Sequence, residues 1–415
     1  MRPARTARVR PDEPGRRSPG VPAVRGRARI QRVGRIEPGA GAPGGEPTVS
    51  WRLVVAALLI GLLLAACGGT SRRGQSASGP AAGGGTPDQQ AVAAARSFLD
   101  TYMISGGRIQ RTDQGGDTVS EGQAYGMLAA VAIGDRRRFQ EIWSWTQRNL
   151  QRPDGLFAYH WQGGHVVDSE PATDADLDTA RALLVAACRF HQPSLRAQAI
   201  RVGRAILAHE TARAGSLEVL LPGPWGNEPA GLAFNPSYVD PTTLRALATA
   251  TGDPRFDALS SDGIRLVNEL TRPLPPDWAI INRQSGQPTP VSGAGATSGP
   301  GMFTYDAPRT LVRFAAASSA AAHAAVARAW SVFAQTPPQD IVTEHQLSGA
   351  AVGSTHNPVT LVGVAGAAKA AGDERVVGVL LAQAERFNRQ YPTYYGAAWV
   401  ALGRLLLTTN RLAPC

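Results

Sequence analysis

Hydrophobic positions recur at three- and four-residue spacing over most of the chain, from about residue 89 to residue 409. That spacing is typical of α-helices with a buried face, and alternating β-branched segments are scarce. Clusters of glycine and proline separate the periodic segments and mark their ends. The pattern predicts twelve helices, at residues 89–104, 121–133, 136–150, 176–190, 194–210, 241–251, 254–270, 306–318, 321–335, 357–371, 374–389 and 394–409.

The connections between these helices alternate in length. Those that leave the even-numbered predicted helices are very short, such as residues 134–135 and 372–373. Most of those that enter the even-numbered helices are long, at residues 105–120, 151–175, 211–240, 271–305 and 336–356. If neighbouring helices run antiparallel, the long loops all lie at one end of the fold.

Six helical hairpins with one elaborated end describe an all-α fold, the (α/α)6 barrel, which we predict for residues 89–415. An α-solenoid is the alternative architecture. No fixed-period repeat in the sequence supports it.

The segment before the predicted barrel has the features of a targeting signal. An uncharged apolar run at residues 53–66 follows Arg52 and ends in Leu64-Ala-Ala-Cys67-Gly. The run is shorter than a membrane span and has the length of a signal-peptide core, and its end resembles the lipobox of bacterial lipoproteins. We therefore predict that residues 53–67 are a signal-peptide core and lipobox, with lipidation at Cys67. A short anchor helix, or secretion with a coincidental cysteine, are the alternatives.

The residues on either side of this signal have no helical pattern. Residues 1–52 are basic and rich in arginine, proline and glycine, and we interpret them as an unstructured region or a mis-assigned start of the gene. Residues 68–88 are rich in glycine, serine and proline, which predicts a flexible linker. The expected location is therefore the outer cell surface, with the chain secreted across the cytoplasmic membrane and held by a lipid anchor.

The charge of the chain is concentrated in this N-terminal region. The whole chain has 42 Lys and Arg against 32 Asp and Glu, a net charge of +10. Residues 1–73 hold 14 arginines and four acids, so they account for the whole excess. Because residues 74–415 have no net charge, they lack the basic excess that is typical of nucleic-acid-binding domains. We expect a monomer and no nucleic-acid partner.

The cysteines and the common motifs exclude several kinds of site. Cys67, Cys188 and Cys415 form no cluster with histidine, and the sequence leaves open whether the last two pair. The run from Asp174 to Asp178 lacks the glycine and glutamate of a calcium loop. Serine-hydrolase, phosphate-loop and zinc-protease motifs are also missing. We predict neither a metal nor a cofactor.

Three carboxylic acids stand at the starts of even-numbered predicted helices, and therefore at the same end of the barrel. They are Glu121, Asp174 and Asp306. Ser120 and Gln123 fit a capping box, which would place Glu121 in a first helical turn. Acids are common at helix starts for structural reasons, but that preference does not explain three of them on one mouth.

Aromatic residues lie close to these acids in the sequence, namely Tyr125, Trp161, Tyr238 and Tyr305. Hydrolysis of a glycosidic bond needs a protonated acid, a base for water and flat apolar faces for sugar rings. Carboxylates on different helices leave room for a water between them, which favours inversion of configuration. Two other function classes stay open: a glycan-binding lipoprotein without turnover, and a helical barrel similar to the terpenoid cyclases.

At this point the sequence resembles glycoside hydrolase family 8, the bacterial endoglucanases, over about residues 90–410. The motifs that carry the resemblance are Ser120-Glu-Gly-Gln-Ala-Tyr-Gly-Met127, Ala172-Thr-Asp-Ala-Asp176, Leu221-Pro-Gly223, Asn235-Pro-Ser-Tyr238, Leu274-Pro-Pro-Asp-Trp278, Tyr305-Asp-Ala-Pro-Arg309 and Tyr394-Tyr-Gly396. The resemblance implies an (α/α)6 barrel and an inverting, endo-acting hydrolase of β-1,4-linked polysaccharide.

The same resemblance implies roles for single residues. Glu121 would be the general acid, Asp306 the general base, and Asp174 the residue that holds the distorted sugar. Tyr305 and Arg309 would flank the base, with Tyr125, Trp161 and Tyr238 as further substrate-binding residues. Since the acid must keep its proton near neutral pH, we expect burial and neighbouring carboxylates to raise the pKa of Glu121.

The exact polysaccharide is less certain than the reaction. With an aspartate at position 306, the sequence resembles the branch of the family that contains cellulases and xylan-active enzymes. We therefore expect β-1,4-glucan as the first candidate substrate. Xylan, mixed-linkage glucan and chitosan are the alternatives. The sequence does not separate degradation of external polysaccharide from trimming of a polymer that the cell exports.

Overall fold

The computed structural model describes residues 85–414. Every predicted helix has a counterpart within about three residues at each end, except that the predicted helix 321–335 is two helices, α9 and α10. The α-helices are α1 Pro87–Tyr102, α2 Ser120–Ile133, α3 Arg136–Asn149, α4 Thr173–Arg189, α5 Pro193–His209, α6 Pro241–Thr251, α7 Arg255–Leu270, α8 Ala307–Ala315, α9 Ala320–Ala327, α10 Trp330–Phe333, α11 Pro358–Ala370, α12 Glu374–Gln390 and α13 Tyr394–Thr408.

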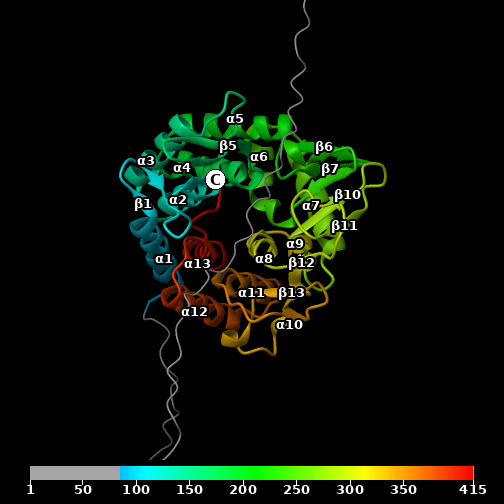
Figure 1. Cartoon of the computed structure of the whole chain (residues 1–415). Helices are drawn as coiled ribbons and strands as arrows, with labels where there is room; N and C mark the ends of the chain where they lie inside the picture. Colours follow the sequence, from blue (N-terminus) through cyan, green and yellow to red (C-terminus); the bar gives the residue numbers. More distant parts are fainter. Residues whose placement is uncertain (1–84, 415) are drawn as a thin grey trace, which may run out of the picture. The chain divides into compact units, whose positions relative to one another are not determined.

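Six of these helices form a closed inner ring. Helix α2 packs on α4, and the ring continues through α6, α8, α11 and α13 back to α2. Helices α1, α3, α5, α7, α9 and α12 pack outside it, each against a sequence neighbour of the ring (Figure 1). This confirms the predicted (α/α)6 barrel.

Sequence composition explains which helices lie inside. Most residues of α2, α4, α11 and α13 are buried, and such all-round burial suits the largely apolar α2, α11 and α13, whereas α4 also buries charged residues. The outer helices α3 and α12 bury a single face, through residues such as Phe139 and Leu380, and expose charged residues on the other.

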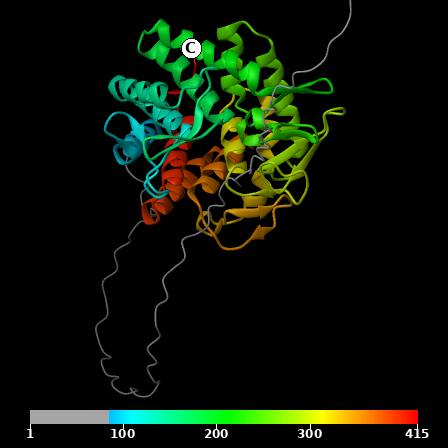
Figure 2. The same ribbon diagram turned by 45° about the horizontal axis from the view of Figure 1, so that its top comes forward.

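The long loops all precede inner helices, as the sequence predicts, but they contain strands that an all-α fold leaves out. In the described residues these strands form five small antiparallel sheets (Figure 2). Their lengths are two to seven residues, too short for a clear two-residue period. The strands are β1 Met103–Ile104, β2 Arg108–Ile109, β3 Thr118–Val119, β4 Ala158–Gln162, β5 His165–Pro171, β6 Thr211–Ala214, β7 Leu217–Leu220, β8 Asn227–Glu228, β9 Gly231–Phe234, β10 Trp278–Ile281, β11 Pro288–Val291, β12 Met302–Phe303, β13 Glu344–Gln346 and β14 Ala351–Val352.

One hydrophobic core connects the described helices, from α1 to Leu412. A group of buried charges lies inside the ring. Arg313 on α8 binds Asp178 on α4 over 2.8 Å, and Arg181 on α4 binds Asp240 before α6 over 2.9 Å. Because the two arginines face two aspartates, no buried charge in this group is left without an opposite charge.

The N-terminal predictions fall largely outside the described residues. These include the basic region 1–52, the signal core and lipobox 53–67 with Cys67, and most of the linker. The predicted linker end at residue 88 is two residues too late, because α1 begins at Pro87 and Thr86 caps it. Cys188 is disulfide-bonded, and Cys415 is not among the described residues. Among residues 85–414, no helix combines the length and the apolar character needed to cross a membrane.

Candidate active site

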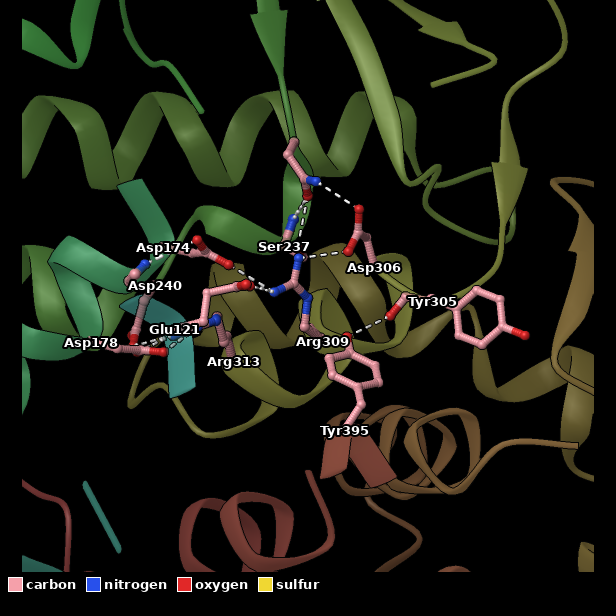
Figure 3. Close-up of polar contacts among 12 residues, drawn as sticks. Glu121, Asp174, Asp178, Ser237, Asp240, Tyr305, Asp306, Arg309, Arg313 and Tyr395 are labelled. Carbon is pink, nitrogen blue, oxygen red and sulfur yellow. Dashed lines mark hydrogen bonds and ion pairs between the residues drawn. The ribbon is translucent and has the colours of Figure 1, made fainter. Parts of the chain in front are cut away.

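The three predicted acids lie together at the loop-bearing end of the inner ring. Glu121 and Asp174 are the second residues of α2 and α4, and Asp306 directly precedes α8. Their side chains point toward one guanidinium group, that of Arg309 on α8 (Figure 3). The structure therefore places residues from three different helices in a single site.

Arg309 connects all three acids. Its Nη1 donates to Asp174 Oδ2 over 2.7 Å and to Glu121 Oε1 over 3.3 Å, while Nη2 donates to Asp306 Oδ1 over 2.7 Å. Only 2% of the Arg309 side chain is exposed. Arg309 therefore flanks Asp306, as the sequence predicts, and a contact of Arg309 with substrate stays a prediction.

The local structure around Glu121 differs from the predicted capping box. Val119 is the N-cap of α2, and the buried hydroxyl of Ser120 has no hydrogen-bond partner. Gln123 instead accepts from the N–H of Ile109 over 2.6 Å and donates to Thr146 Oγ1 over 2.9 Å. The capping box was thus a wrong prediction, since Gln123 connects the first long loop to α3 and does not cap its own helix.

The surroundings of Glu121 favour the protonated form of its carboxyl group. Burial raises its pKa well above the ordinary value for glutamate, and the charge of Asp174 raises it further. Arg309 opposes these effects because a cation favours the ionised form. About 20% of the Glu121 side chain is still exposed, so its proton can reach a bound molecule. This confirms the predicted direction and cause of the pKa shift.

Both carboxylate oxygens of Asp306 are held by hydrogen bonds. Arg309 donates to Oδ1, and the buried Asn235 donates from Nδ2 to Oδ2 over 3.1 Å. Asn235 is fixed in turn because its Oδ1 accepts from both the N–H and the hydroxyl of Ser237. With 29% of its side chain exposed, Asp306 is oriented yet open to solvent.

The predicted aromatic platforms have different surroundings. Tyr125 is only 1% exposed and its ring packs edge-on to Trp399 at 5.8 Å, so it does not offer a ring face to a sugar in this structure. Tyr238 is partly buried, and the Arg309 guanidinium lies over its ring at 5.4 Å. Tyr238 therefore lies directly beside the three acids.

Trp161 and Tyr305 are both partly buried. Trp161 lies on β4, where the guanidinium of Arg108 covers its ring at 4.8 Å. The carbonyl of Tyr305 accepts from the hydroxyl of Tyr395 on α13 over 2.9 Å, which fixes the main chain just before Asp306. Tyr305 thus lies directly beside Asp306, while Trp161 packs against Arg108 and Trp145 in another long loop.

Several site residues were not predicted from the sequence, namely Asn235, Asp277, Tyr395, Trp225 and Trp278. Trp278 packs against Trp225 at 6.0 Å and against Tyr238 at 6.2 Å, and the three rings form an aromatic group beside the site. Asn235, Asp277, Trp278 and Tyr395 lie in motifs that the sequence analysis had noted. Nothing in those motifs indicated which side chains turn toward Asp306.

The part of the chain that the structure describes contains no group of three or more His, Cys, Asp or Glu side chains suited to a metal ion. The site is therefore a set of carboxylates around an arginine, bordered by aromatic residues.

Comparison with known proteins agrees with this geometry. The model of the glycosyl hydrolases family 8 matches residues 86–409. The chain is 39% identical over 226 residues to a probable endoglucanase of Novacetimonas hansenii, covering 52% of this chain and 64% of that protein. It is 29% identical over 257 residues to an endoglucanase of Cellulomonas uda, covering 60% and 69%.

The fold is also similar to solved structures. Endo-β-1,4-glucanase CMCax from Acetobacter xylinum matches with a TM-score of 0.66 and 31% identity, over 78% of this chain and 100% of that one. The family model covers more than half of the chain and includes all three site acids. This chain therefore belongs to glycosyl hydrolase family 8.

Proposed function

We propose that this protein is an inverting, endo-acting hydrolase of β-1,4-linked glucan, with Glu121 as general acid and Asp306 as general base. The observation that carries the proposal is the position of these two acids on opposite ends of one buried guanidinium group. The endoglucanase names of the relatives support the choice of glucan.

The proposed reaction is a single displacement. Asp306 takes a proton from water while the water oxygen attacks the anomeric carbon. The glycosidic bond breaks at the same time, and its oxygen receives the proton of Glu121. Arg309 lies between the two carboxylates, so a guanidinium group and two hydrogen bonds separate the acid from the base. This separation leaves room for the attacking water on one side of the sugar.

Asp174 has a supporting position in this scheme. It is 1% exposed, and its Oδ1 accepts from the N–H of the next residue, Ala175, over 2.9 Å. Its negative charge helps Glu121 to keep the proton that the reaction needs. A direct contact of Asp174 with the distorted sugar stays a prediction.

The test is release of reducing ends by the chain from Gly68 onward on carboxymethylcellulose, mixed-linkage β-glucan, xylan and chitosan. We expect activity on a glucan, and its loss in Glu121→Gln. Glu141→Gln is the matched control, because Glu141 pairs with Arg137 on the outer surface of α3. Folded protein with no turnover on all four polymers would contradict the proposal and favour glycan binding without hydrolysis.

We also propose that Cys67 carries a lipid that holds the enzyme at the outer face of a membrane. The apolar run at residues 53–66 and its lipobox-like end at Cys67 support this proposal. Pro87 and Gln90 at the start of α1 line a cavity of about 1090 Å³, together with the last residues of α8 and α13. The described chain thus enters the barrel at the end opposite the three acids.

Fractionation of cells that produce the full chain tests the anchor. We expect the wild type in the membrane fraction and Cys67→Ser in the soluble extracytoplasmic fraction, with equal specific activity. Membrane association that survives Cys67→Ser would contradict lipidation at this residue and favour an anchor helix.

A further inference from the structure

We propose that Asp277 is a positioning residue for Asp306: it caps α8 from a separate loop and so leaves the carboxylate of Asp306 free to serve as the base. This inference rests on the proposed function, because it takes Asp306 as the base.

The contacts of Asp277 are those of a helix cap. Its Oδ1 accepts from the N–H groups of Asp306 over 3.1 Å and Ala307 over 2.7 Å. The same oxygen accepts from the N–H of Thr304 over 3.1 Å, and Oδ2 bonds the hydroxyl of that threonine. Asp277 therefore binds three backbone N–H groups at the start of α8.

Asp306 has the sequence position that normally supplies such a cap. A helix begins with N–H groups that have no partner in the helix, and an aspartate at the N-cap usually accepts from one of them. Asp306 is the N-cap of α8, yet its side chain makes no such hydrogen bond. Because Asp277 replaces it, the oxygens of Asp306 can bind Arg309 and Asn235 and still face the open site.

Asp277 is itself firmly placed. Its N–H donates to the carbonyl of Met302 over 2.8 Å, and it directly precedes β10, which pairs with β9 and β11. Asn235, the other partner of Asp306, directly follows β9. One small sheet therefore carries both groups that orient the base.

The charges around the pair are consistent with this role. Burial and the neighbouring charge of Asp306 raise the pKa of Asp277 to about 7, against the effect of its hydrogen bonds with Thr304 and Ala307. The charged and titratable groups that interact with Asp306 are Arg309 on α8, the helix that Asp306 precedes, Glu121 on α2, Tyr238 in the 3-10 helix Pro236–Tyr238 and Tyr395 on α13. Below pH 7 Asp277 is mainly neutral, so it can act as a cap without adding a second charge beside the base.

Two substitutions separate positioning from chemistry. Asp277→Asn keeps an oxygen for the three N–H groups and an N–H₂ group for Thr304, so it copies the neutral acid. We expect its kcat to stay within about threefold of the wild type at pH 6. Asp277→Ala removes the cap, and we expect kcat to fall about 100-fold with a much smaller change in KM, because misplaced catalytic groups cost rates of that order.

Amide hydrogen exchange of residues 304–309 measures whether the backbone N–H groups at the start of α8 are hydrogen-bonded, and it does not depend on enzyme activity. We expect protection at Thr304, Asp306 and Ala307 to be lost in Asp277→Ala and kept in Asp277→Asn. The control is Asp262→Ala on α7, whose carboxylate accepts from the N–H of Glu218 over 2.8 Å on the outside of the barrel. This control should leave kcat and the exchange of residues 304–309 unchanged.

Three outcomes would overturn the inference: Asp277→Ala with the kcat of the wild type, Asp277→Asn as inactive as Asp277→Ala, or protection at residues 304–309 that does not depend on residue 277. If the wild type itself has no turnover, the proposed function fails. The exchange experiment then decides separately whether Asp277 holds the start of α8.

Discussion

Arg309 and Asp174 form a buried ion pair across the inner ring, with an N–O distance of 2.7 Å and exposed fractions of 2% and 1%. The pair joins α8 to α4, although the two residues are 135 positions apart in the sequence. Removing one partner of a buried pair costs far more than the pair itself contributes, because the other charge is left without compensation. The stability of the ring and the geometry of the acids therefore depend on the same arginine.

We expect Arg309→Met to lower the free energy of unfolding by about 3–5 kcal/mol and to abolish hydrolysis. Urea unfolding and reducing-end release measure the two effects. Arg137→Met is the control, because its pair with Glu141 is exposed and worth about 1 kcal/mol or less. Equal losses in the two variants would show that Arg309 has no special role in compensating the acids.

Glu121→Gln should change stability and activity in opposite directions at neutral pH. Folding raises the pKa of the Glu121 carboxyl group, so this group stabilises the folded state fully at pH values below its unfolded pKa of about 4.3. This stabilisation is lost as the pH rises through the raised pKa of the folded state. The neutral amide avoids that loss. We therefore expect Glu121→Gln to be inactive yet to have a higher Tm than the wild type at pH 7 to 8, with little difference at pH 4. A Tm difference that does not change with pH would contradict the raised pKa.

The helices and the end of the barrel that holds the site could be predicted from the sequence. Long periodic segments bounded by glycine and proline specify helices well, and the alternation of loop lengths placed Glu121, Asp174 and Asp306 on one mouth. The geometry of their environment could not be predicted in this way. Asn235 and Asp277 bind Asp306 from 71 and 29 residues away, and both lie in loops without any periodicity.

The wrong prediction of a capping box has a physical cause. Gln123 fits the pattern of such a box, but its side chain faces the interior of the fold. A buried N–H such as that of Ile109 must find an acceptor, and leaving it without one costs more than a helix cap contributes. Tertiary contacts therefore decided the partners of the Gln123 side chain.

Alanine substitutions at Gln123 and Ser120 should differ in their effect on the free energy of unfolding. Gln123→Ala removes the acceptor of the Ile109 N–H and the donor to Thr146, so we expect a loss of about 1–3 kcal/mol in the free energy of unfolding. Ser120→Ala should cost less than about 0.5 kcal/mol, because the serine hydroxyl makes no hydrogen bond. A capping box would give the serine variant a loss of about 1 kcal/mol, so urea unfolding of both variants distinguishes the two structures.

The last prediction concerns a second pair of acids behind the site. Asp176 on α4 and Glu210 at the end of α5 are both 0% exposed. Burial raises the pKa of Glu210 well above its ordinary value, and the charge of Asp176 raises it further. The pKa of Asp176 is also raised, mainly by burial, although Asp176 accepts from the N–H of Phe157.

Because both acids bind protons more tightly in the folded state, the wild type should lose stability as the pH rises from about 5 to 8. Glu210→Gln removes one of the two groups that must lose a proton, so its free energy of unfolding should fall less over the same interval. Glu269→Gln, at an exposed pair with Arg265 on α7, should run parallel to the wild type. Urea unfolding at pH 5 and pH 8 decides the matter: equal losses in Glu210→Gln and the wild type would show that the buried pair does not control the pH dependence of stability.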